Sequence, residues 1–144
     1  MTPVVEAVQV VNPATERPIA ELERSSAADV DLAVRRAKDA FPAWSAVAAV
    51  DRGRLLRRLA AAVEDHGEDL ARLEMRNVGK PLADARWEMG MVADVFHFYA
   101  GAVDKHHGET IPVAGGVDAT VREPLGVVGL IVPWNFPPTT SAAG

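Results

Sequence analysis

The fold is decided by the stretch Pro124-Leu125-Gly126-Val127-Val128-Gly129-Leu130-Ile131-Val132-Pro133-Trp134-Asn135-Phe136-Pro137. Residues 125–132 are apolar or glycine throughout, which is typical of a parallel strand covered on both faces by helices. Gly126 and Gly129 argue against a helix, and Pro133 must end the strand because it lacks an N–H. We therefore predict a strand at 125–132 and then an irregular loop, at the edge where parallel sheets bind ligands.

This loop displays one side-chain amide, that of Asn135. An amide N–H can donate a hydrogen bond to an oxygen that becomes negative during a reaction. An asparagine beside proline also commonly bonds its own backbone. The residue alone therefore leaves a structural role open beside a catalytic one.

Six blocks along the chain resemble, in the same order, those of the NAD(P)-dependent aldehyde dehydrogenases. The signature block is Glu-Pro-Leu-Gly-Val-Val-Gly…Pro-Trp-Asn-Phe-Pro at 123–137, and the other five are Asn12-Pro13-Ala14-Thr15, Ala40-Phe41-Pro42-Ala43-Trp44, Gly79-Lys80-Pro81, Tyr99-Ala100-Gly101 and His107-Gly108-Glu109-Thr110-Ile111-Pro112. The resemblance implies an α/β fold, the N-terminal part of an aldehyde dehydrogenase-like fold. Its expected parts are a helical layer, a projecting β-hairpin and the first strand of a Rossmann-like parallel sheet, so the fold would be incomplete.

The resemblance also implies a reaction. In this family a cysteine thiolate attacks an aldehyde, hydride passes to NAD or NADP, and a glutamate-activated water releases the carboxylic acid. By the same resemblance, Asn135 helps to hold the oxyanion, and Ile131, Val132, Pro133 and Trp134 line the cofactor site. Trp134 favours the hydrolytic members over the acylating ones. The expected substrate is a small-molecule aldehyde.

Some family features are missing. The 144 residues contain no cysteine, and the family's general-base glutamate and ribose-binding lysine lie downstream of the signature block. We therefore expect the isolated chain to be inactive, truncated and marginally stable. Pro138 and Ala143 depart from the larger apolar residue and the tryptophan usual there. Two alternatives remain: a non-catalytic module that pairs with full-length subunits, or a truncated gene product without a role.

We expect three regions in the chain. Residues 1–107 would form strands and helices of the cofactor-binding domain, residues 108–123 a hairpin of the oligomerisation element, and residues 124–144 the first Rossmann-like strand with its loop. Two short strands are predicted at 8–11 and 19–22, around a turn-prone Asn-Pro segment.

Apolar periodicity predicts four helices. The first begins at a capping box formed by Ser26 and Asp29 and should end at Pro42. The second breaks at Gly67. The third runs over 68–78 and ends at a glycine followed by Lys-Pro.

The fourth predicted helix runs from Pro81 to about Val103 and carries two neighbouring apolar stripes. The first stripe is Leu82, Ala85, Met89, Val92, Phe96, Tyr99 and Val103, and the second is Trp87, Met91, Val95 and Phe98. Two stripes predict a core helix buried on much of its circumference rather than a coiled-coil strand.

Residues 109–113 and 117–121 predict a hairpin around Gly115-Gly116, because polar and apolar residues alternate in the second segment. An unpaired edge of such a hairpin favours association. The expected assemblies are therefore a homo-oligomer or a complex with a full-length homologous subunit.

Composition excludes several classes. With 15 Lys and Arg against 20 Asp and Glu, the net charge is −5, so a nucleic-acid partner is not expected. The basic cluster of Arg52, Arg54, Arg57 and Arg58 is interpreted as a solvated helix face.

The set His97, His106, His107 and Glu109 has no known metal-ligand spacing, and no metal site is predicted. Neither a membrane span nor a secretory leader at 1–6 is expected, and the predicted location is cytoplasmic.

Overall fold

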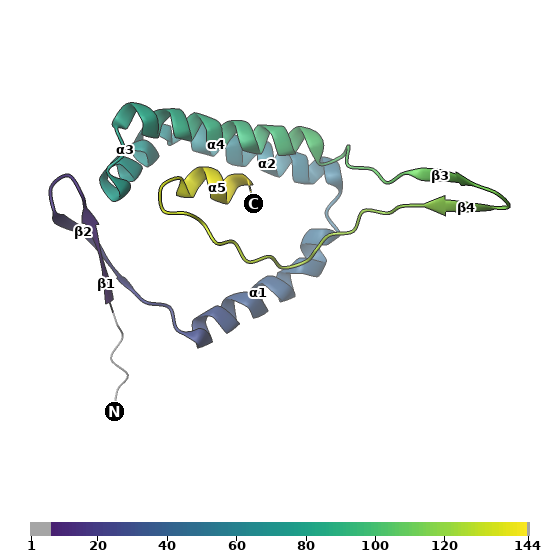
Figure 1. Ribbon diagram of the computed structural model, residues 1–144, viewed down its shortest axis with the longest axis horizontal. Helices are drawn as coiled ribbons and strands as arrows, with labels where there is room; N and C mark the ends of the chain where they lie inside the picture. Colours follow the sequence, from purple (N-terminus) through teal and green to yellow (C-terminus); the bar gives the residue numbers. More distant parts are fainter. Residues whose placement is uncertain (1–6, 144) are drawn as a thin grey trace.

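The computed structural model describes residues 7–143, so the leader prediction at 1–6 lies outside the described residues. The elements in chain order are β1 Ala7–Asn12, β2 Arg17–Glu23, α1 Ala27–Ser45, α2 Ala49–Asp65, α3 Gly67–Val78, α4 Leu82–Ala102, β3 Thr110–Val113, β4 Gly116–Ala119 and α5 Pro137–Ala143. Helices α2, α3 and α4 form a layer, α5 lies alongside α4, and the β3–β4 hairpin projects away from the helices (Figure 1).

Both predicted hairpins are confirmed. Strands β1 and β2 pair antiparallel with an irregularity between Val10 and Val11, and the Asn12 Oδ1 atom accepts the backbone N–H of Ala14 at 2.9 Å in the connecting turn. Strands β3 and β4 pair antiparallel through Val113 and Gly116. Gly115 has φ 74° at the turn, a backbone conformation that glycine adopts without strain.

Helix α1 begins as predicted but ends later than predicted. Ser26 and Asp29 form the reciprocal capping box, and hydrogen bonds from the Ser26 side chain and backbone lower the pKa of Asp29. Pro42 lies inside the helix, which continues to Ser45. The carbonyl of Pro42 accepts the Ser45 hydroxyl at 3.0 Å and the Ala46 N–H at 3.2 Å. These bonds complete the last turn, so the missing proline N–H does not end it.

The predicted limits of α3 and α4 are correct to within about one residue, and the predicted break near Gly67 is also present, since α2 ends at Asp65 and Gly67 begins α3. Gly79 follows α3 in the left-handed conformation, with φ 75°. A Cβ atom there would lie 2.6 Å from the Cγ atom of Pro13, in the turn between β1 and β2. This glycine therefore allows the first hairpin to pack closely against the end of α3.

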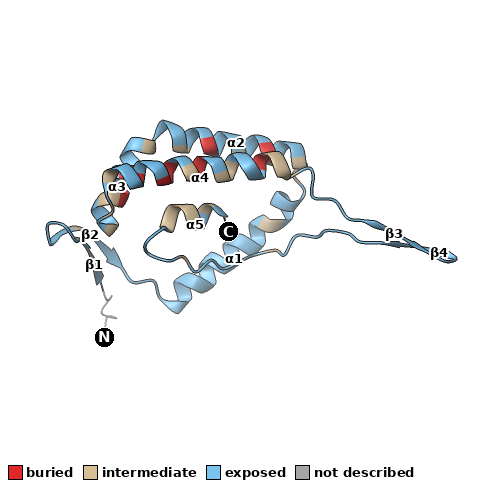
Figure 2. Cartoon of the chain, turned by 45° about the horizontal axis from the view of Figure 1, so that its top comes forward, coloured by how far each residue is buried: buried red, intermediate tan, exposed pale blue. Residues whose placement is uncertain are grey.

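The core lies where α2, α3 and α4 meet (Figure 2). Its buried apolar members are Ala60, Ala71, Ala85, Met89, Val92, Ala93 and Ala100. Most are alanines, which allow close approach of the helices. Gly53 serves the same purpose, because a Cβ atom there would lie 2.9 Å from the Ala100 carbonyl oxygen.

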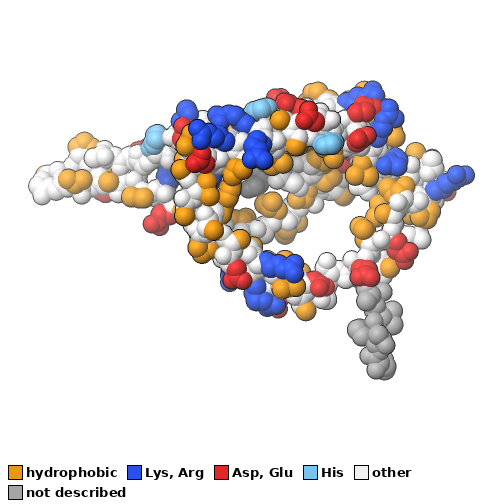
Figure 3. All heavy atoms as spheres, turned by 180° about the vertical axis from the view of Figure 1, so that it is seen from behind, with side chains coloured by type: hydrophobic (Ala, Val, Ile, Leu, Met, Phe, Trp, Pro, Cys, Tyr) orange, Lys and Arg blue, Asp and Glu red, His pale blue; other side chains and the backbone are white. Residues whose placement is uncertain are grey.

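The second apolar stripe of α4 is not buried as predicted. Trp87 is 61% exposed and Phe98 is 68% exposed, and the other two members, Met91 and Val95, are only half-buried. The first stripe does face the core through Ala85, Met89 and Val92, which supports the core-helix interpretation over the coiled coil. Hydrophobic side chains border an opening through the molecule (Figure 3). The marginal stability expected from the sequence stays a prediction.

The predicted strand at 125–132 is wrong for the described chain. These residues are irregular, and the sheets formed by residues 7–143 are the two hairpins alone. A strand is stabilised by hydrogen bonds to a neighbouring strand. Residues 125–132 have no such neighbour here, so their apolar composition cannot by itself produce a strand.

An exposed ion-pair cluster joins α3 to α4. The carboxylate of Glu68 accepts two hydrogen bonds from Arg86, at 2.7 and 2.9 Å, and lies 2.6 Å from an Arg72 nitrogen. The hydrogen bonds from Arg86, and the nearby Arg72 charge, lower the pKa of Glu68 to about 2 from 4.5. The pairs are solvated, so their effect on stability is small.

This cluster predicts an acid dependence of stability. A depressed carboxyl pKa stabilises the folded state above about pH 4.5, and the effect is lost as the pH falls towards about 2. Urea unfolding at several pH values should therefore show a stability difference between the wild type and Glu68→Gln that shrinks across this window. A difference that stays constant from pH 7 to pH 2 would contradict the assignment. Glu21→Gln, which breaks no ion pair within residues 7–143, is the control.

Candidate functional site

The five residues predicted for the site follow one another along a single turn that leads into α5. Ile131 is fully exposed, Trp134 is 76% exposed, and Val132 is half-buried. Pro133 and Asn135 are exposed as well. The turn thus presents apolar side chains and one amide to the surroundings.

The Asn135 side chain makes no hydrogen bond to any residue between 7 and 143. The alternative of an asparagine bonded to its own backbone is therefore not what the described chain shows. Immediately after it, the Thr140 N–H donates to the Phe136 carbonyl at 3.1 Å and begins α5. The amide is free to donate to a ligand.

A buried polar cluster fixes the segment that follows Asn135. Glu88 on α4 is completely buried, and its Oε1 atom accepts the hydroxyl of Thr139 at 3.1 Å. Its other oxygen accepts a hydrogen bond from the Lys80 ammonium. Lys80 also donates to Glu74 at 3.1 Å and lies 4.2 Å from the ring centroid of Phe136.

The two carboxylate partners of Lys80 stabilise its protonated, positively charged form. Burial acts to lower the pKa of Lys80, but hydrogen bonds to Glu88 and Glu74 outweigh it and raise the pKa above its usual value. The Lys80 side chain is only 10% exposed, and those of Glu74 and Glu88 are 6% and 0% exposed. The ammonium therefore stays protonated and compensates two carboxyl groups that would otherwise be costly to bury.

Sequence reasoning missed this cluster, although it left a signal. Glu88 lies three residues after Ala85 and four before Val92, so it is on the buried face of α4. A charged residue on a buried face requires a partner. Two cations lie within eight residues upstream, Arg86 and Lys80 of the Gly-Lys-Pro block; Arg86 pairs with the exposed Glu68, and Lys80 is the partner of Glu88.

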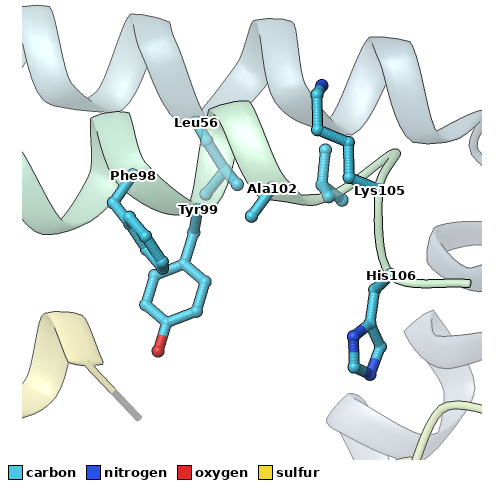
Figure 4. A pocket seen from close by; sticks show the side chains of 7 residues that line it. Leu56, Phe98, Tyr99, Ala102, Lys105 and His106 are labelled. Carbon is cyan, nitrogen blue, oxygen red and sulfur yellow. The ribbon is translucent and has the colours of Figure 1, made fainter.

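A cavity of about 590 Å³ lies elsewhere, between the end of α4 and α2. It is lined by Leu56, Phe98, Tyr99, Ala102, Val103, Lys105 and His106. Tyr99 and His106 project on the same side of the chain, from α4 and from the connection that follows it (Figure 4). Because none of residues 131–135 lines this cavity, it is distinct from the predicted site.

The other candidate groups do not assemble into sites. His97 lies 3.1 Å from a Glu64 oxygen in an exposed pair, and residues 7–143 contain no cluster of three or more potential metal ligands. No helix in the same range is long and apolar enough to cross a membrane.

Known proteins share this arrangement of helical layer, projecting hairpin and signature turn. The model of the aldehyde dehydrogenase family matches residues 2–143. The chain belongs to the aldehyde dehydrogenase family. The α/β class predicted from sequence is also confirmed, because the structure matches the N-terminal part of solved aldehyde dehydrogenases.

Curated relatives of this aldehyde dehydrogenase chain include the hydroxyisobutyraldehyde dehydrogenase of Mycolicibacterium austroafricanum, 43% identical over 88% of this chain and 25% of the relative. Human retinal dehydrogenase 2 is 44% identical over 89% of this chain and 26% of its own length. The chain thus spans about a quarter of the length of these relatives.

Solved structures agree with this placement. A putative aldehyde dehydrogenase from Burkholderia cenocepacia has a TM-score of 0.91 and 48% identity, over 95% of this chain and 29% of that one. PnpE, solved in complex with nicotinamide adenine dinucleotide, has a TM-score of 0.90 and 45% identity, over 95% of this chain and 28% of its own. The fold described above is therefore shared by complete enzymes of the family.

Proposed function

We propose that these residues are the N-terminal part of an enzyme that oxidises an aldehyde to a carboxylic acid with NAD or NADP. The observation that carries the proposal is the Asn135 amide, which is exposed and bonded to no described residue, at the start of α5 in a chain of this family. We also propose that the chain divides into the regions 1–107, 108–123 and 124–144. The cytoplasmic location stays a prediction.

Asn135 acts by stabilising charge. When a nucleophile attacks an aldehyde, the carbonyl oxygen becomes negative, and a fixed amide N–H stabilises it more than it stabilises the uncharged carbonyl. The nucleophilic thiol belongs to residues outside these 144, because the sequence contains no cysteine. Asn135 would thus contribute one donor to an active site completed by other residues.

The names of the relatives support this class of reaction. Hydroxyisobutyraldehyde dehydrogenase and retinal dehydrogenase 2 are named for aldehyde oxidation. PnpE was solved with nicotinamide adenine dinucleotide, and a 33% identical structure is described as an E. coli NADP dependent enzyme. NAD and NADP therefore both remain candidate cofactors.

The exposed turn fits part of such a cofactor. Ile131 and Trp134 present apolar surface, which suits a ring of the dinucleotide, with Val132 and Pro133 between them. Residues 124–143 contain no Lys or Arg, so cationic side chains for the phosphates would come from other residues. The bound cofactor would accept the hydride, while these residues of the chain would hold and orient it.

The proposal is tested with the isolated chain and with a chimera. The purified 144-residue chain should produce no NADH or NADPH from hydroxyisobutyraldehyde. A chimera in which residues 7–143 replace the matching segment of the Mycolicibacterium hydroxyisobutyraldehyde dehydrogenase should oxidise it. A folded chimera that binds NAD but turns over no aldehyde would reject the proposal, and so would activity of the isolated chain.

An interaction module is the second candidate, and the β3–β4 hairpin favours it. Every residue of the two strands is exposed, with Val117 at 85%, and the hairpin projects from the helices (Figure 1). Its open edges could pair with another subunit. Size-exclusion chromatography with light scattering, with and without a full-length relative, tests this, and the absence of any mixed assembly would end the idea.

A further inference from the structure

The segment from 124 to 143 is joined to the helical layer by very few polar contacts. Within residues 7–143, one side-chain hydrogen bond makes this connection, from the Thr139 hydroxyl to Glu88. One cation–π contact adds to it, from Lys80 to Phe136. Apolar packing adds to these contacts, with Ala142 against the core cluster and Ala143 near Met91 and Val95 of α4.

Both polar contacts lead back to the same buried group. Glu88 accepts the Thr139 hydroxyl on one oxygen and the Lys80 ammonium on the other. Lys80 in turn faces the Phe136 ring. The two contacted residues stand one and four positions after Asn135, so any shift of Glu88 would be passed directly to the turn that carries the amide.

The chemistry of the cluster suits positioning better than stabilisation. Buried ion pairs contribute little net stability compared with apolar residues of the same size, but a satisfied network allows one arrangement of its members. No buried side-chain nitrogen or oxygen among the described residues lacks a partner. Every buried polar atom of the network is therefore bonded in the described geometry, and Thr139 of α5 is part of it.

We propose that Glu88 is a positioning residue, which holds the Asn135 turn through Thr139 and, by way of Lys80, through Phe136. The catalytic role of Asn135 rests on the proposed function. The claim that Glu88 fixes the position of the turn rests on the described contacts alone.

The position is tested by NMR on the 15N-labelled 144-residue chain, without cofactor or aldehyde. Thr139→Val removes the donor and keeps the shape of the side chain. We expect the amide of Thr140 to exchange with solvent about tenfold faster, and the side-chain amide resonances of Asn135 to move. Thr139→Ser keeps a hydroxyl and should restore both signals. Thr140→Val is the matched control, because the Thr140 hydroxyl bonds no described side chain.

Two results would overturn the inference. One is unchanged exchange and unchanged Asn135 resonances in Thr139→Val, and the other is an equal disturbance in Thr140→Val. In the chimera, Thr139→Val should lower kcat by about tenfold with little change in KM, since the oxyanion contact is made in the transition state. An inactive chimera would reject the proposed function and leave the NMR result standing, so the two failures are distinguishable.

Discussion

Replacing Asn135 with alanine in the chimera should lower kcat by about 100- to 1,000-fold. Asn135 carries the one side-chain amide in the signature turn, and no described residue forms a hydrogen bond with it. Its loss removes a donor that is needed only when the aldehyde oxygen carries negative charge. Because the uncharged aldehyde gains little from the same contact, KM should change far less than kcat.

Steady-state kinetics on the purified chimera measures this effect. Ser141→Ala is the control, since Ser141 is exposed on α5 and its hydroxyl makes no hydrogen bond to another residue in the described range. Thermal unfolding of each variant shows whether the fold is kept. An Asn135→Ala chimera within threefold of the parent kcat would remove Asn135 from the catalytic machinery.

The helices could be predicted from sequence because their signals are local. The capping box of Ser26 and Asp29, and Gly79 after α3, act within one turn of the helix they limit. Pro42 was misleading for a local reason too, since neighbouring hydrogen bonds to its carbonyl carry the helix past it. In each of these places a few adjacent residues decide the outcome.

The predictions of a strand at 125–132 and of a buried second stripe on α4 were wrong because they depend on distant segments and not on local signals. Both patterns indicate burial, and burial requires surfaces that other segments supply. Within residues 7–143, Trp87 and Phe98 stay more than half exposed and Ile131 is fully exposed. The sequence therefore predicted which side chains are suited to burial and could not predict whether a neighbour is present.

The candidate site divides in the same way. Asn135 was found from a short contiguous motif, whereas its support comes from Lys80 and Glu88, which lie about fifty residues earlier in the chain. Only the packing of α5 beside α4 brings these groups together. In that placement Lys80 supplies the buried positive charge opposite Glu88.

Replacing Lys80 with methionine should lower the free energy of unfolding by about 3–5 kcal/mol. The change leaves the carboxyl groups of Glu74 and Glu88 nearly or fully buried without their cation. Breaking a buried pair in this way leaves the cost of desolvation uncompensated. Urea unfolding of the 144-residue chain, followed by circular dichroism, measures the loss.

A triple variant separates the charge from the packing. Combining Lys80→Met with Glu74→Gln and Glu88→Met removes every charge of the cluster, so most of the lost stability should return. Arg86→Met is the control for removal of a cation, because its pair with Glu68 is exposed on both sides, and its effect should be far smaller. A Lys80→Met chain as stable as the wild type would mean that the two carboxyl groups are satisfied without Lys80. The cluster could then not hold the turn in the way that its geometry indicates.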